Sequence, residues 1–140
     1  MIGSRDEPVA REASVLICDD ERMIRRLLAE IVEMANGVRV AGEAADGSEA
    51  VREAERLRPE IILLDLAMPV RTGLEVLPEL RELVPATQII AFSGFSRAVL
   101  GEQALEAGAD VYVEKGAPVA EVLSALEQAA SRTRSPTPPA

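Results

Sequence analysis

The 140-residue sequence contains no histidine, no tryptophan and a single cysteine, Cys18. Without histidine, the chain cannot form a histidine-based catalytic group or a metal site with imidazole ligands. A lone cysteine excludes an internal disulfide and is typical of a reducing compartment, so we expect the protein in the cytoplasm. Only two phenylalanines and one tyrosine are present, so a folded core must be mainly aliphatic.

The sequence also lacks the patterns of membrane and secretory segments. No run of about 18 apolar residues occurs, so we expect no transmembrane helix. The first residues, MIGSRDEPVAREAS, are polar and of mixed charge, unlike a secretory signal. The net charge of −9 argues against non-specific binding to nucleic acid or anionic lipid. A chain of this length with 48% hydrophobic residues is expected to form one globular domain.

Short apolar runs alternate with amphipathic stretches along the chain. The apolar runs predict strands at 14–18, 38–44, 61–65, 88–92 and 110–113. Apolar residues at helical spacing predict helices at 21–35, 46–57, 74–83, 97–107 and 119–130. Pro78 lacks an amide hydrogen, so we expect its helix to be short or kinked. Five strands that alternate with five helices predict a doubly wound α/β fold, with a parallel sheet covered on both faces.

The two ends of the chain differ in composition from the part between them. We expect an ordered domain over residues 13–131, preceded by a flexible leader at 1–12. The end of the chain, SRTRSPTPPA, is polar and rich in proline, which predicts a disordered tail at 132–140. Within the domain, Asp46 and Glu49 have the spacing of a capping box that opens the second helix.

Polar side chains follow four of the five predicted strands, where each strand ends. These side chains are Asp19, Asp20, Asp65, Ser93, Glu114 and Lys115. The carboxyl ends of parallel strands share one edge of a sheet, where ligands of doubly wound folds bind. Three of the six aspartates and the only lysine of the chain are therefore expected together at this edge.

Such a cluster is suited to phosphoryl chemistry. Three crowded carboxylates repel one another unless a cation joins them, and ligand sets made only of oxygen suit Mg²⁺. A carboxylate bound to the metal can attack a phosphoryl group, because the metal offsets the repulsion between the two anions. The Ser93 hydroxyl and the Lys115 ammonium could hold the remaining phosphoryl oxygens.

Each of these residues also has a structural interpretation. Asp19 and Asp20 could be N-caps of the first helix, and Asp65 a turn residue. Ser93 could be a cap, and a single lysine among arginines could reflect chance. Their joint placement at one edge nevertheless favours the functional interpretation.

The ordered set of motifs resembles the receiver domains of bacterial two-component response regulators over about residues 13–131. The motifs that carry the resemblance are LICDDE, DLAMP at 65–69 with Gly73, Ser93-Gly94, and Tyr112 three residues before Lys115. The resemblance implies a flavodoxin-like sheet with strand order 2-1-3-4-5. It also implies that Asp65 is a phosphoacceptor that receives phosphate from the phosphohistidine of a sensor histidine kinase or a phosphotransfer protein.

The resemblance assigns a role to each residue of the cluster. The implied Mg²⁺ ligands are Asp19, Asp20, Asp65 and the backbone carbonyl of Ala67. Lys115 would contact the phosphoryl group, Ser93 would report its presence, and Tyr112 would be the rotameric switch. Such a protein is not an enzyme beyond its own phosphorylation and slow dephosphorylation. This sequence departs from the family pattern in having Gly116 after Lys115, where most members have a proline with a cis peptide bond.

Several alternatives remain open at this stage. The chain could be an intermediate phosphorelay carrier, the receiver portion of a longer regulator, or a receiver-like module that is never phosphorylated. An aspartyl-phosphate phosphohydrolase is disfavoured because Ala67 stands where a general acid would be needed. The sequence ends soon after the receiver region, so we expect no direct DNA binding. Output is expected through an unidentified protein on the face of the fourth helix, last strand and fifth helix, from a monomer or a phosphorylation-linked dimer.

Overall fold

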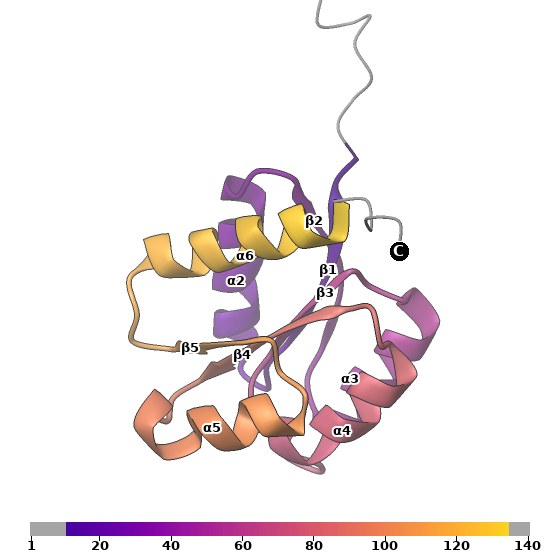
Figure 1. Cartoon of the computed structure of the whole chain (residues 1–140), viewed down its shortest axis with the longest axis vertical. Coiled ribbons are helices and arrows are strands. Elements are labelled where there is room, and N and C mark those ends of the chain that lie inside the picture. Colours follow the sequence, from indigo (N-terminus) through magenta and orange to yellow (C-terminus); the bar gives the residue numbers. More distant parts are fainter. Residues whose placement is uncertain (1–10, 135–140) are drawn as a thin grey trace, which may run out of the picture.

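The computed structural model describes residues 11–134, in which five parallel strands alternate with five helices (Figure 1). The strands are β1 (Ala13–Cys18), β2 (Val38–Ala44), β3 (Ile61–Leu64), β4 (Gln88–Ser93) and β5 (Val111–Glu114). The helices are α2 (Arg22–Met34), α3 (Gly47–Leu57), α4 (Gly73–Leu83), α5 (Arg97–Ala107) and α6 (Val119–Arg134). Every predicted strand and helix is present, and all but α6 agree within one residue at each end.

The last helix differs most from its prediction. It continues to Arg134, so residues 132–134, which were expected in the tail, are helical. No glycine or proline interrupts the sequence between Pro118 and Pro136, so nothing in the chain forces an earlier end. The predicted leader and tail otherwise fall on residues 1–10 and 135–140, outside the described residues.

The strands are arranged in the order β2-β1-β3-β4-β5, with parallel pairing throughout. This order confirms the predicted flavodoxin-like topology. Helices α2 and α6 cover one face of the sheet, whereas α3, α4 and α5 cover the other (Figure 1). The chain reverses its direction of travel across the sheet between β1 and β3, and this switch point is where ligands of such sheets bind.

The core is aliphatic and consists of two layers separated by the sheet. In β1, Val15 and Ile17 pack toward α2 and α6, while Leu16 and Cys18 pack toward α3 and α4. Strand β3 alternates in the same way and is buried along its whole length. Burial on both faces explains why these strands appear in the sequence as continuous apolar runs instead of alternating patterns.

Side-chain caps explain where α3 and α4 begin. Asp46 caps α3 by accepting a hydrogen bond from the Glu49 amide at 2.7 Å, as predicted, but Glu49 accepts its return bond from Ala45 instead of Asp46. A full capping box, which was not predicted, joins Thr72 and Glu75 at the start of α4.

The proline inside α4 does not shorten this helix. The helix has 11 residues, as many as α3 and α5, with Pro78 in its interior. Gly108 follows α5 with a φ of 132°, a conformation that favours glycine.

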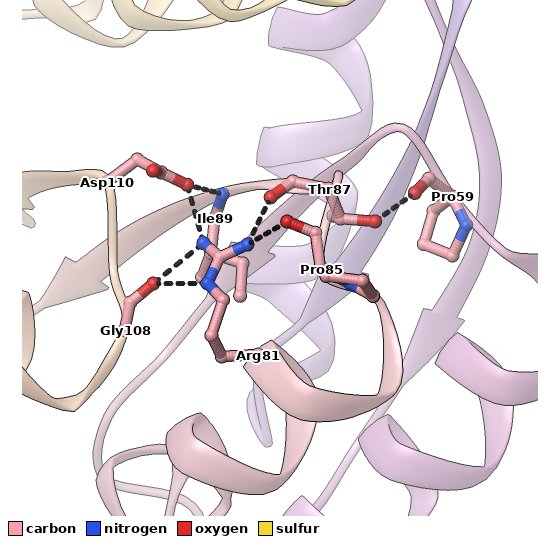
Figure 2. A network of polar contacts seen from close by, with 7 residues as sticks. All are labelled: Pro59, Arg81, Pro85, Thr87, Ile89, Gly108 and Asp110. Carbon is pink, nitrogen blue, oxygen red and sulfur yellow. Dashed lines mark hydrogen bonds and ion pairs between the residues drawn. The ribbon is translucent and has the colours of Figure 1, made fainter.

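A network around Arg81, at the end of α4, joins several segments at the amino edge of the sheet (Figure 2). The Arg81 guanidinium donates hydrogen bonds of 2.7–3.1 Å to the carbonyls of Pro85, Thr87 and Gly108 and to the carboxylate of Asp110. Asp110 in turn accepts from the Ile89 amide at 2.8 Å. The network ties the ends of α4 and α5 to the starts of β4 and β5.

Replacing Arg81 by alanine is expected to lower the free energy of unfolding by about 2–3 kcal/mol, because four acceptors lose a charged donor. Arg81→Lys should recover only part of this loss, since an ammonium cannot match the planar fork of a guanidinium. Urea unfolding followed by circular dichroism measures both effects. The matched control is Arg52→Ala, which removes an exposed pair with Glu49 at 3.8 Å. Losses of equal size for Arg81→Ala and the control would contradict the prediction.

Candidate functional site

Three aspartates converge at the carboxyl edge of the sheet. Asp19 and Asp20 follow β1, and Asp65 follows β3, the neighbouring strand at the switch point. The Asp65 amide donates to the carbonyl of Cys18 at 2.9 Å, which holds the two strand ends side by side. One carboxylate oxygen from each aspartate lies within 4.8 Å of the other two. Asp19 and Asp65 are buried, whereas Asp20 is exposed to solvent.

The only lysine reaches into this cluster from β5. Lys115 Nζ lies 2.8 Å from Asp19 Oδ2 and 3.3 Å from Asp65 Oδ2, with 22% of its side chain exposed. Its backbone amide donates to the Ser93 carbonyl at 2.7 Å, which fixes the end of β5 against β4. A single ammonium therefore faces two buried carboxylates and cannot neutralise both.

Backbone amides and one ammonium are the partners of the two buried carboxylates. Asp19 Oδ1 accepts from the Glu21 amide at 2.9 Å, and Asp65 Oδ1 accepts from the Ala67 amide at 3.1 Å. Asp19 Oδ2 is buried and has the Lys115 ammonium, at 2.8 Å, as its one charged partner. A carboxylate oxygen that shares its cation with Asp65, beside a third carboxylate, fits the oxygen ligands that Mg²⁺ requires.

The pKa values of the two central groups reflect this environment. Burial raises the pKa of the Asp65 carboxyl most strongly, and the charge of Asp19 adds to this increase. The Ala67 amide and the Lys115 ammonium act in the opposite direction, but the pKa stays above its ordinary value. Burial alone would lower the pKa of Lys115, yet the two carboxylates outweigh it and raise this pKa.

The raised pKa of Asp65 predicts how Mg²⁺ binding depends on pH. A protonated carboxyl is a poor metal ligand, so Mg²⁺ should bind more weakly as pH falls through the raised pKa, above the ordinary 3.8. The stability of the metal-free protein should change in the opposite direction, rising as pH falls. Because the folded state binds this proton more tightly, the destabilisation caused by ionised Asp65 should be relieved as pH falls through that pKa toward the ordinary value.

Melting temperatures with and without Mg²⁺ over a series of pH values measure both effects. The rise in melting temperature caused by Mg²⁺ should become smaller as pH falls through the raised pKa of Asp65. Over the same pH range, protonation of Asp65 should make the metal-free protein more stable. Asp65→Asn is the control, since it removes that contribution. An increment that stays constant down to pH 3.8 would contradict the prediction.

Ser93 and Tyr112, the two residues expected to form the switch, are both hydrogen-bonded to Phe95. Ser93 is fully buried at the end of β4, and its Oγ accepts from the Phe95 amide at 3.1 Å. Tyr112 is buried in the core, and its hydroxyl donates to the Phe95 carbonyl at 2.6 Å. The peptide groups of Phe95 therefore join Ser93 to Tyr112, a link that sequence reasoning missed because side-chain identity does not show it.

The loops around the site explain two sequence features. A Cβ at Gly73 would collide with the carbonyl of Asp65, so glycine lets the start of α4 lie against the phosphoacceptor candidate. The peptide bond between Lys115 and Gly116 is trans, like all those described. In the loop between β3 and α4, exposed Val70 has a φ of 68°, which strains a β-branched residue.

The structure excludes the helix-capping roles considered for Asp19, Asp20 and Ser93. The N-cap of α2 is Glu21, so neither Asp19 nor Asp20 caps that helix. The N-cap of α5 is Ser96, so Ser93 is not a cap. None of the helices in residues 11–134 is long and apolar enough to cross a membrane.

Comparisons with known proteins agree with this site. The family model of the response regulator receiver domain matches residues 15–127. The nitrate/nitrite response regulator protein NarL of Escherichia coli is 39% identical over 128 residues, which are 91% of this chain and 57% of NarL. The chemotaxis protein CheY of Thermotoga maritima is 34% identical over 114 residues, which are 81% of this chain and 94% of CheY. The chain thus spans little more than half of the first relative and most of the second.

One of the similar solved structures is a complex that contains BeF3 and Mg²⁺. A chain from the CheX–CheY–BeF3–Mg²⁺ complex of Borrelia burgdorferi is 28% identical, with a TM-score of 0.78 over 84% of this chain and 89% of that chain. The acidic triad with Lys115 is typical of the phospho-accepting site of such domains. Because the family match covers most of the chain and agrees with its fold and acidic site, we conclude that this chain belongs to the response regulator receiver domains of two-component signalling.

Proposed function

We propose that Asp65 takes a phosphoryl group from the phosphohistidine of a sensor histidine kinase or a phosphotransfer protein, in a reaction that needs Mg²⁺. The observation that carries this proposal is a cluster of three carboxylates, two of them buried and paired with the single ammonium of Lys115. A structural salt bridge needs one acid for one base, whereas this site has an excess of negative charge that a divalent cation would balance.

The metal would be held by the same set of oxygens that repel one another. Its ligands would be the carboxylates of Asp19, Asp20 and Asp65 and the backbone carbonyl of Ala67. When bound, Mg²⁺ supplies positive charge that offsets the repulsion between a carboxylate and a phosphoryl group. The buried Oδ2 of Asp19 supports this assignment, because it shares its one cationic partner, Lys115, with Asp65.

The protein side chains would position the reacting groups. The Ala67 amide orients the Asp65 carboxylate, one oxygen of which forms the new bond to phosphorus. The bond between phosphorus and the imidazole nitrogen of the donor breaks, and its electron pair stays on that nitrogen. Lys115 would bind one phosphoryl oxygen as a compact charge, and the Ser93 hydroxyl would donate to another.

A small phosphodonor tests this function directly. Incubation with acetyl phosphate and Mg²⁺ should add the mass of one phosphoryl group to the intact protein, through a bond that is stable in acid and labile in base. Excess chelator should prevent the gain. Rapid turnover of acetyl phosphate without an adduct would instead indicate a phosphohydrolase, and no reaction at all would indicate a binding module that is never phosphorylated.

We further propose that the phosphorylated domain signals in the cytoplasm through contacts on the face formed by α5, β5 and α6, without direct DNA binding by residues 11–134. The exposed apolar side chains Phe95, Val99, Leu105 and Val119 on or beside these elements support a protein partner. A coupling of about 1–3 kcal/mol would change partner affinity about 5- to 150-fold. The partner could be an output protein, the next carrier of a relay, or a second copy in a phosphorylation-linked dimer of an otherwise monomeric domain.

A further inference from the structure

The first turn of α5 is capped from another element. Its N-cap residue, Ser96, makes no side-chain capping bond, and no acidic residue lies in its first turn. The Arg97 amide, the first of the helix, instead donates to Glu114 Oε2 on β5 at 2.8 Å. Glu114 therefore supplies the acceptor and the negative charge that a helix start requires.

The side chain of Arg97 makes a second link to the same strand. Its Nη2 donates to the carbonyl of Tyr112 at 2.8 Å and lies 3.8 Å from Glu121 Oε2 on α6. Tyr112 returns a bond from its hydroxyl to the Phe95 carbonyl at 2.6 Å. The start of α5 and the loop before it are thus fastened to β5 by three hydrogen bonds.

These bonds lie between the phosphoacceptor site and the face proposed for output. Glu114 directly precedes Lys115, whose ammonium contacts Asp19 and Asp65. Phe95 is bonded to Ser93 on one side and to Tyr112 on the other. A displacement of the Ser93 loop would therefore reach β5 through the bond between Phe95 and Tyr112, and α5 is joined to β5 through Glu114 and the Arg97 side chain.

We propose that Glu114 is a positioning residue of the switch, which holds the first turn of α5 on β5 so that a change at Ser93 reaches the exposed face of α5. This inference rests on the proposed phosphorylation of Asp65. It differs from a purely local capping role, because a local cap would affect the stability of α5 without affecting its response to phosphorylation.

The test compares wild type with Glu114→Ala in two steps. Before any phosphodonor is added, hydrogen exchange of the Arg97 amide should be about fivefold faster in the variant, the effect of losing an N-cap. After labelling with acetyl phosphate and Mg²⁺, intact mass should show the same extent of phosphorylation in both proteins. Phosphorylation-dependent chemical-shift changes across α5 should fall to less than about half of their wild-type size, because the first backbone amide of α5 is no longer bonded to β5 and only the Arg97 side chain still joins the helix to this strand.

The fluorescence of Tyr112 reports the change in the core independently of the change in α5. Tyr112 is the only tyrosine and tryptophan is absent, so intrinsic fluorescence reports this one residue. Its change on phosphorylation should persist in Glu114→Ala, since the bond to Phe95 remains. Glu114→Gln keeps an acceptor oxygen and should restore most of the α5 response. Glu102→Ala, an exposed glutamate on α5, should behave as wild type.

The outcomes distinguish this inference from the function on which it rests. No labelling of the wild type would overturn the phosphoacceptor function itself. Normal labelling of both proteins with an undiminished α5 response in Glu114→Ala would overturn only the role of Glu114. Equal exchange of the Arg97 amide in both proteins would show that Glu114 does not cap α5, and would overturn the inference as well.

Discussion

Asp65→Asn is expected to abolish the Mg²⁺-dependent mass gain from acetyl phosphate. The amide that replaces the carboxylate is a poor nucleophile and weakens the metal site, while its size and its acceptor for the Ala67 amide are kept. The fold should survive, because the change removes a buried charge from a cluster of like charges. The raised pKa of Asp65 indicates that its ionised form destabilises the folded protein, so the variant should unfold at equal or higher urea concentration.

The same chemical change elsewhere provides the control for this experiment. Asp46→Asn also replaces an aspartate by its amide, but Asp46 caps α3, and asparagine is an equally good N-cap. Labelling of this variant should match wild type. Undiminished labelling of Asp65→Asn would show that the phosphoryl group is attached elsewhere, and loss of labelling in both variants would indicate a general defect.

The fold and the location of the acidic site follow from the sequence because the sheet is parallel. In IILLD the apolar run is buried on both faces, and Asp65 must lie at the carboxyl end of β3. The run that ends at Cys18 places Asp19 in the same way on the neighbouring strand. Once both runs are recognised as parallel strands, their acidic residues must share one edge, whatever rotamers they adopt.

Other contacts depend on side-chain conformation and could not be predicted. The sequence shows that Glu114 is near the site but not that its carboxylate turns to the amide of Arg97. It likewise gives no sign that Arg81 joins three carbonyls and Asp110, since most arginines of this chain could be solvated surface. Backbone acceptors carry no sequence signature, so such networks become visible only in three dimensions.

One local feature was visible in the sequence and was missed. Thr72 and Glu75 have the spacing of a capping box and form it in the structure, whereas the sequence prediction named only Asp46 and Glu49. The two motifs are equivalent as patterns. They differ in the return bond. Glu75 accepts from the amide of its N-cap residue, Thr72, at 3.1 Å, whereas Glu49 accepts from Ala45, the residue before its N-cap.

Lys115→Ala is expected to have the largest effect on stability. Without the ammonium, Asp19 and Asp65 are two buried carboxylates that have lost their shared ion-pair partner. The free energy of unfolding in metal-free buffer should fall by about 3 kcal/mol, near the lower end for a broken buried ion pair because Lys115 is partly exposed. Labelling of Asp65 by acetyl phosphate should also slow, because the phosphoryl group loses its cationic contact.

Magnesium and pH distinguish this cause from a simple loss of packing. Mg²⁺ should stabilise Lys115→Ala more than wild type, because the metal then supplies the only cation for the carboxylates. In wild type, the raised pKa of Lys115 means that its contribution is fully present below the ordinary value of 10.5 and is lost as pH rises through the folded-state pKa. The variant should lack this alkaline loss. Urea unfolding near neutral pH, with and without Mg²⁺, measures the loss of stability in the variant and the Mg²⁺ increment. Unfolding of the metal-free proteins on both sides of pH 10.5 measures the alkaline loss. An equal Mg²⁺ increment in both proteins would mean that Lys115 stabilises the domain by packing, not by balancing the charge of the acidic site.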